Sequence, residues 1–199
     1  MRSISEGLIK KFFSDFKEEE QEVLEYGLTI LLSTVSGYLL IFLVSSLFNV
    51  ASLALTAAVT GGVIKIFAGG VHASCFRNCI LTGTTVFTTI GVLAGYLGGE
   101  VSIMTGLFIF FVLVIGSLAI YRYAPAHVKE KPIKSNKRRF KFKIYSFVVF
   151  FVIMLFYFIL YLNDYGSQVI LAGLFAVLWQ SFSLTPVAYS LRGRSYHGR

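Results

Sequence analysis

A short segment, residues 65–79, concentrates the side chains of this 199-residue chain that could perform chemistry. It contains both cysteines, Cys75 and Cys79, together with His72 and the pair Gly69-Gly70. A thiol and an imidazole suffice for nucleophilic catalysis, because the imidazole can accept the thiol proton and leave a thiolate. One histidine without a nearby acid gives too few ligands for zinc, which takes three or four. The segment therefore favours a Cys–His pair over a metal site.

The residues alone leave the partner of His72 open. On an uninterrupted helix Cys75 would be its i,i+3 neighbour, which favours Cys75. Cys79 would share the same face but lie about 10 Å away along the axis, so a direct contact requires a bend. The glycines at 69 and 70 permit one. A non-catalytic interpretation also stands, in which both cysteines pack as small hydrophobic residues beside a surface histidine.

The composition of the chain indicates which kind of secondary structure positions these residues. Hydrophobic residues make up 56% of the chain and charged residues 14%, with a mean hydropathy of +0.74. A soluble domain is about one quarter charged, and a disordered chain is poor in aromatic residues. With 20 Phe and 11 Tyr, the chain fits neither class. Lipid is the expected solvent.

Long stretches without charge predict an all-α polytopic membrane protein. About 20 apolar residues cross a bilayer as a helix. Lipid offers no hydrogen-bond partner to the backbone, so a span must satisfy its own N–H and C=O groups, as a helix does. The charge-free stretches therefore predict six transmembrane helices in one integral membrane domain over residues 1–199, with the bundle at 27–190. The six predicted spans are 27–48, 50–68, 80–98, 101–121, 144–162 and 168–190.

The distribution of Lys and Arg predicts the orientation. Six crossings place every Lys and Arg on one side, and the connections near residues 49, 98–100 and 163–167 contain none. Basic residues favour the cytoplasmic side, so both termini and the 65–79 segment are expected there, with residues 191–199 as a cytoplasmic tail. The net charge of +8 is then a topology signal and not a nucleic-acid footprint.

Residues 1–26 differ from the spans. Ile4, Leu8, Phe12 and Phe16 recur at helical spacing among charged residues, which is typical of an amphipathic helix at the membrane interface. It would serve either as a surface anchor or as a helix that binds a partner.

Two motifs give the chain a family resemblance. The first is Lys65 with Gly69-Gly70-Val71-His72-Ala73 and Cys79; the second is Tyr123-Ala124-Pro125-Ala126 followed by Lys131-Pro132-Ile133. Together with the length and the six-span layout, they resemble the accessory gene regulator protein B (AgrB) family, the membrane cysteine endopeptidases of bacterial quorum sensing. The resemblance covers nearly the whole chain.

The resemblance implies roles for particular residues. It makes His72 the general base and Cys79 the nucleophile, in place of Cys75, with Lys65 and Gly70 in support. Lys129 and Lys131 fall in the family's basic loop, where Glu130 interrupts an otherwise basic triplet. Lys65 stands where an Arg can occur; it keeps the charge but lacks the bidentate guanidinium.

The resemblance also implies an activity in the bacterial cell membrane. The enzyme would cleave an AgrD-type propeptide at the cytoplasmic face and form a cyclic thiolactone through an acyl-enzyme thioester, without a cofactor. Expected partners are that propeptide, membrane lipid and a second copy of the chain. The bases of residues 122–143 would set topology, contact anionic lipid or dock substrate. The alternative is a non-catalytic membrane transporter or assembly partner.

Overall fold

The computed structural model describes residue 16 and residues 18–71, 76–126, 135–194 and 196. Within them the chain forms helices and no strand. Five helices are long and apolar enough to cross a membrane, and α7, with 17 residues, is a shorter apolar helix, which confirms the all-α polytopic fold. The helices are α2 (Glu18–Ser46), α3 (Ala51–Ala68), α4 (Phe76–Leu97), α5 (Ile103–Tyr123), α6 (Asn136–Leu162), α7 (Ser167–Ser183) and α8 (Pro186–Leu191).

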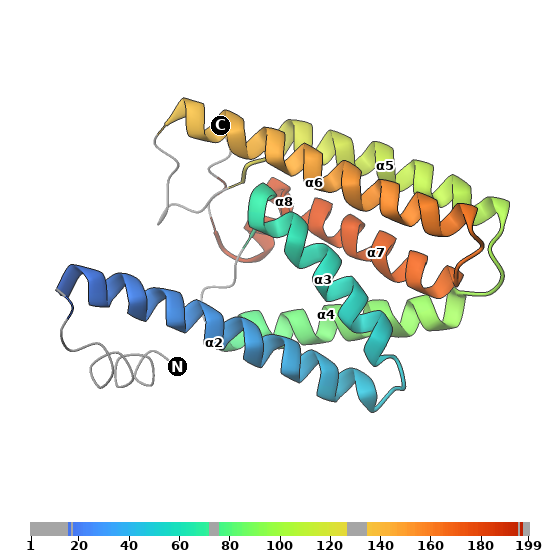
Figure 1. The fold of residues 1–199 in the computed structure, drawn as a ribbon, viewed down its shortest axis with the longest axis horizontal. Helices are drawn as coiled ribbons and strands as arrows, with labels where there is room; N and C mark the ends of the chain where they lie inside the picture. Colours follow the sequence, from blue (N-terminus) through green and yellow to red (C-terminus); the bar gives the residue numbers. More distant parts are fainter. Residues whose placement is uncertain (1–15, 17, 72–75, 127–134, 195, 197–199) are drawn as a thin grey trace.

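The six long helices run up and down, so their ends gather in two groups (Figure 1). One end collects the last turns of α3, α5 and α7 and the first turns of α2, α4 and α6. The described Lys and Arg residues from Lys65 onward lie there, and we call it the basic end. The opposite, distal end holds the connections around Asn49, Gly98–Glu100 and Asn163–Tyr165.

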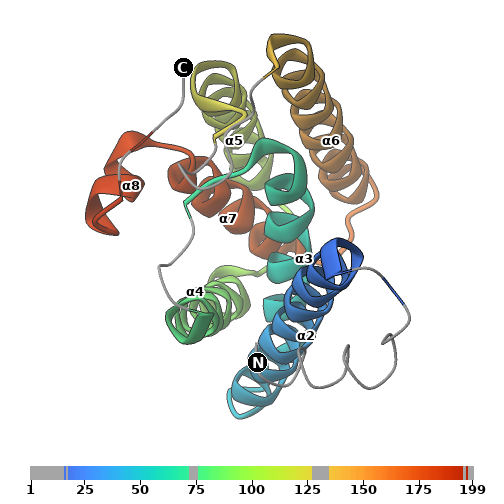
Figure 2. The same ribbon diagram turned by 90° about the vertical axis from the view of Figure 1, so that its left-hand side faces the viewer.

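Helices α3 and α7 form the centre of the bundle, with α5 and α6 on one side and α2 and α4 on the other (Figure 2). Their small residues allow this: Ala54, Ala57 and Ala58 of α3 are fully or almost fully buried. Small side chains let helix backbones approach closely where lipid gives no hydrophobic driving force. A hydrogen bond of 2.6 Å between the hydroxyls of Thr60 and Tyr157 joins α3 to α6 inside this core.

The three largest differences from the sequence prediction are at helix boundaries. Helix α6 begins at Asn136 and not at 144, because Lys and Arg are good helix formers and extend the helix beyond its apolar part. The sixth apolar segment breaks after Ser183 and not at 190. Proline disfavours helical backbone in the residue before it, and Thr185 is extended with Pro186 opening α8.

The first span also begins earlier than predicted. Helix α2 starts at Glu18, so residues 18–26 are continuous with the span, although we expected them in a separate interfacial helix. The amphipathic positions Ile4, Leu8 and Phe12 lie outside the described residues.

Candidate functional site

The site is built where α3 ends. Gly69 has a φ of 74° and Gly70 a φ of 129°, backbone conformations that residues with a Cβ rarely adopt. A Cβ on Gly69 would lie 1.9 Å from the backbone oxygen of Ala126, and one on Gly70 would lie 2.7 Å from Oγ of Ser183. The glycine pair therefore both ends the helix and admits two neighbouring segments to its backbone.

The first of these segments belongs to the second sequence motif. The Gly70 amide donates to the Ala126 oxygen (3.3 Å), and the Ala126 amide donates to the Ala68 oxygen (2.9 Å), so Gly69 and Ala126 pair in parallel. The Ala124–Pro125 peptide bond that leads into this pairing is cis. Gly69 of the first motif and Ala126 of the second, more than 50 residues apart in sequence, are thus held side by side by backbone hydrogen bonds.

The second segment is the last turn of α7. Nε2 of Gln180 donates to the Gly69 oxygen at 2.7 Å, and the Val71 amide donates to the Ser183 oxygen at 3.0 Å. The Ser183 hydroxyl in turn donates to Oε1 of Gln180 at 3.1 Å. Both side chains are buried, with exposed fractions of 3% and 4%. The backbone up to Val71, the residue before His72, is therefore fixed on both sides.

Gln180 and Ser183 were not among the site residues predicted from the sequence. A signal was present, since Gln180 is an amide within an apolar segment, and strongly polar side chains in membrane helices are usually functional. Nothing in the local pattern, however, connects it to a glycine 111 residues away.

Lys65 connects the two halves of the predicted pair. It lies in the last turn of α3, and its Nζ donates to the Val71 oxygen at 3.1 Å. The same ammonium interacts electrostatically with Cys79 and with Arg192. Lys65 thus contacts the residue before His72 and lies within electrostatic range of the predicted nucleophile.

Cys79 lies in the first turn of α4 as an exposed free thiol. The chain leaves α3 at Ala68, so residues 65–79 do not form the uninterrupted helix that favoured Cys75. His72, Cys75, Lys129 and Lys131 lie outside the described residues. Lys65, Gly70 and Cys79 are all at the basic end, and within the described ranges no three His, Cys, Asp or Glu residues gather as a metal site would require.

The C-terminal segment packs against the end of α5 beside the same site. Tyr189 of α8 packs edge-on against Tyr196 at 5.3 Å, and the Tyr196 hydroxyl donates to the Tyr123 oxygen at 3.3 Å. Tyr189 is completely buried, and burial raises its pKa to about 12. Its hydroxyl has no hydrogen-bond partner among the residues that the structure describes. These contacts hold the segment that leads to Ala126.

Comparison with known proteins gives one consistent result. The family description "Accessory gene regulator B" matches residues 2–184. A putative AgrB-like protein of Clostridium perfringens strain SM101 is 28% identical over 184 residues, which cover 86% of this chain and 84% of the relative. The accessory gene regulator protein B of Staphylococcus aureus strain MW2 is 24% identical over 166 residues, 82% of each chain. No solved structure matches.

Proposed function

Because the chain belongs to the accessory gene regulator B family, we propose that it is a membrane cysteine endopeptidase with His72 and Cys79 as its catalytic pair. Its substrate is an AgrD-type propeptide, and its product is a cyclic thiolactone peptide of the quorum-sensing system. The basic end of the bundle faces the cytoplasm, as the positive-inside tendency favours. Membrane lipid and a second copy of the chain are the further partners that we expect.

The bridging position of Lys65 carries the proposal. Its Nζ is hydrogen-bonded to the Val71 oxygen and interacts electrostatically with Cys79. Lys65 therefore links the residue that precedes the predicted base to the helix turn that carries the predicted nucleophile.

The chemistry proceeds in two acyl transfers. His72 accepts the thiol proton of Cys79, and the sulfur attacks the scissile carbonyl carbon. The C–N bond then breaks, and the imidazolium donates its proton to the leaving amine, which departs with the C-terminal fragment. A thiol of the bound peptide attacks the thioester that remains and passes its proton through His72 to the departing Cys79. A thioester is exchanged for a thioester, so the second step needs no further energy source.

The surroundings support the required geometry. Hydrogen bonds from Gln180 and Ala126 hold the backbone before His72, while α4 presents Cys79 at the surface where a propeptide can reach it. General base catalysis requires the base within hydrogen-bond reach of the thiol. Anchoring the backbone that leads to one partner, and carrying the other partner on a helix, reduces the motion between the two segments.

The test is cleavage of the propeptide by protein reconstituted in vesicles. We expect Cys79→Ser and His72→Ala to lose cleavage by at least about a thousandfold, as removal of a nucleophile or its base does in other enzymes. Cys75→Ser is the matched control and should keep wild-type activity. With wild-type protein, mass spectrometry should detect a hydroxylamine-sensitive acyl adduct on Cys79.

Cleavage retained by Cys79→Ser would refute the assignment. Loss of cleavage in Cys75→Ser with retention in Cys79→Ser would make Cys75 the nucleophile. A correctly folded wild-type protein that never cleaves its propeptide would favour the non-catalytic transporter or assembly partner.

A further inference from the structure

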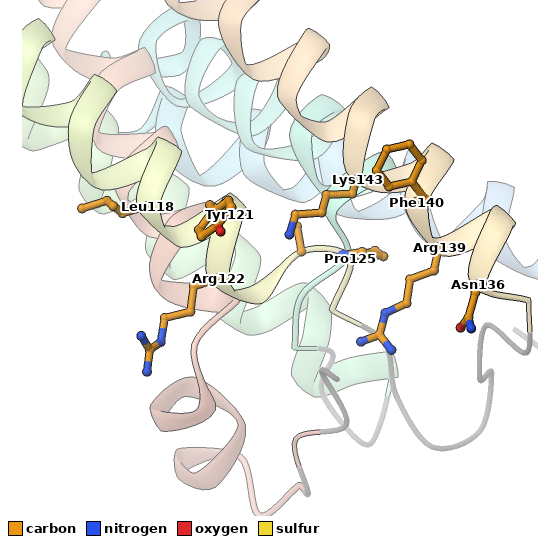
Figure 3. A pocket seen from close by; sticks show the side chains of 9 residues that line it. Leu118, Tyr121, Arg122, Pro125, Asn136, Arg139, Phe140 and Lys143 are labelled. Carbon is orange, nitrogen blue, oxygen red and sulfur yellow. The ribbon is translucent and has the colours of Figure 1, made fainter.

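A groove of about 800 Å³ lies between the last turns of α5 and the first turns of α6 (Figure 3). Its volume falls within the range of about 300–1,000 Å³ that is usual for small-molecule sites. Three cations line it, Arg122 from α5 and Arg139 and Lys143 from α6. None of the described residues in its lining is acidic.

Four of the five bases of α6 form two pairs with the same spacing. Arg139 and Lys143 are four residues apart, so they share the face of the helix that turns toward α5, and both are partly buried. Lys137 and Lys141 have the same spacing but are exposed and do not line the groove. Nζ of Lys143 lies 4.7 Å from the ring centre of Tyr121 on α5, so it reaches across the groove. We call Arg139 and Lys143 the inner pair and Lys137 and Lys141 the outer pair. Within the inner pair, the contact with Tyr121 holds Lys143 against α5.

The length and charge pattern of α6 lead us to expect the groove at the depth of the lipid headgroups. Helix α6 has 27 residues and is therefore about 40 Å long, about 10 Å longer than the hydrocarbon layer. Its bases occupy only the first two turns, before the apolar run that starts at residue 144. The walls of the groove include Leu118 and Phe140, which are 59% and 66% exposed. Cations at headgroup depth thus adjoin apolar surface that faces the lipid.

We propose that this groove binds one anionic phospholipid. Arg122, Arg139 and Lys143 hold the phosphodiester, and the acyl chains lie against Leu118 and Phe140. Guanidinium groups bind phosphate oxygens through two parallel hydrogen bonds, and an ammonium adds a point charge. An acidic peptide would match the charges but not the apolar wall that continues into the lipid. The proposal does not depend on the catalytic activity.

Native mass spectrometry of the purified full-length protein tests the proposal. In detergent, with added phosphatidylglycerol or phosphatidylcholine, we expect one phosphatidylglycerol to be retained in preference to phosphatidylcholine. The double variant Arg139→Ala/Lys143→Ala should retain it at least about tenfold more weakly. The matched control Lys137→Ala/Lys141→Ala removes the same charge from the same helix and should change retention less than about twofold.

Equal weakening in both double variants would overturn the proposal, because it would show diffuse attraction and no defined site. Equal retention of the two lipids would also overturn it. Displacement by millimolar glycerol phosphate would indicate a free-phosphate site, and displacement by an acidic peptide would indicate a peptide site; either refutes the lipid. If the inner double variant unfolds, as judged by its melting temperature, Arg122→Gln on α5 makes the same comparison.

Discussion

At both ends of the bundle, a glutamine side chain of α7 donates a hydrogen bond to a glycine carbonyl, but the two glutamines differ in burial. At the basic end, Nε2 of Gln180 donates to the oxygen of Gly69 at 2.7 Å. At the distal end of the same helix, Nε2 of Gln168 donates to the oxygens of Gly95 at 3.1 Å and Gly98 at 3.4 Å. Gln180 is buried, whereas Gln168 is exposed. Water can replace a lost hydrogen bond at the second position but not at the first.

The connections between helices also differ between the two ends: those at the distal end are local turns, and the one at Gly69 depends on long-range contacts. At the distal end, Asn49 and Asp164 have positive φ values and close short turns. At the basic end, the chain at Gly69 is held instead by residues from α7 and by Ala126, both distant in sequence. A site that brings separate segments together has to be assembled by long-range contacts. The comparison therefore predicts that equal substitutions at the two ends will have unequal effects on activity.

The largest expected effect comes from Gly69→Ala. A Cβ there would lie 1.9 Å from the Ala126 oxygen, and the φ of 74° is strained for alanine. The two motifs must then separate, and we expect propeptide cleavage to fall by at least about a hundredfold, as misplacement of about 1 Å can do. Cleavage by purified protein in vesicles, normalised to the monodisperse fraction, measures this.

The matched control is Gly99→Ala at the distal end, where a Cβ would meet nothing within 4 Å. It should cleave like wild type. If both alanine variants keep full activity, the backbone pairing of Gly69 with Ala126 does not matter for catalysis.

A smaller effect is expected from Gln180→Leu. The substitution leaves the Gly69 oxygen without the donor seen in the structure, a loss of about 1–3 kcal/mol for a buried acceptor. Because Gln180 positions the backbone and does not touch the substrate in our proposal, kcat should fall about tenfold or more while KM stays nearly constant. Steady-state kinetics with the propeptide separates the two constants.

Gln168→Leu removes the equivalent donor at the distal end and should leave both constants within about twofold of wild type. If both leucine variants lose the same activity, and the loss follows the decrease in their melting temperatures, Gln180 contributes only to stability. The prediction that equal substitutions at the two ends have unequal effects on activity would then be wrong.

The sequence predicted the spans well because each is a local pattern of about 20 apolar residues between charges. It predicted the end of α3 at residue 68, where the glycine pair follows. It misplaced the start of α6, because hydropathy detects only the apolar part of a helix that long basic side chains extend. Helix ends that depend on helix propensity and not on apolarity are therefore the least predictable.

The site was predictable only in part. The two cysteines, His72 and the glycine pair lie in one segment, so a Cys–His pair could be proposed from it, although only the family resemblance selected Cys79 over Cys75. Gln180 and Ala126 contribute through tertiary hydrogen bonds, and no period or spacing encodes such contacts. The pairing of the two motifs likewise became evident only in three dimensions.

The smallest expected effect concerns Tyr189, which braces the basic end. Its hydroxyl has no partner among the described residues, so Tyr189→Phe at pH 7 should change stability by no more than about 1 kcal/mol and leave cleavage unchanged. The contribution of Tyr189 to stability should become measurable at alkaline pH. Its pKa is about 12 in the folded chain and about 10 when unfolded, so the neutral phenol stabilises the fold below pH 10. That contribution is lost as the pH rises from about 10 to 12.

Melting temperatures between pH 9 and 12 measure this contribution. Wild type should lose stability more steeply than Tyr189→Phe, because only wild type has to keep this buried phenol protonated against an unfolded state that releases the proton. Tyr165→Phe at the distal end is the control; Tyr165 is 58% exposed, and its loss should leave the wild-type slope unchanged. Parallel curves for wild type and Tyr189→Phe would mean that water reaches the Tyr189 hydroxyl. The basic end would then be as open as the distal end, and the burial that distinguishes Gln180 from Gln168 would not extend to the C-terminal segment.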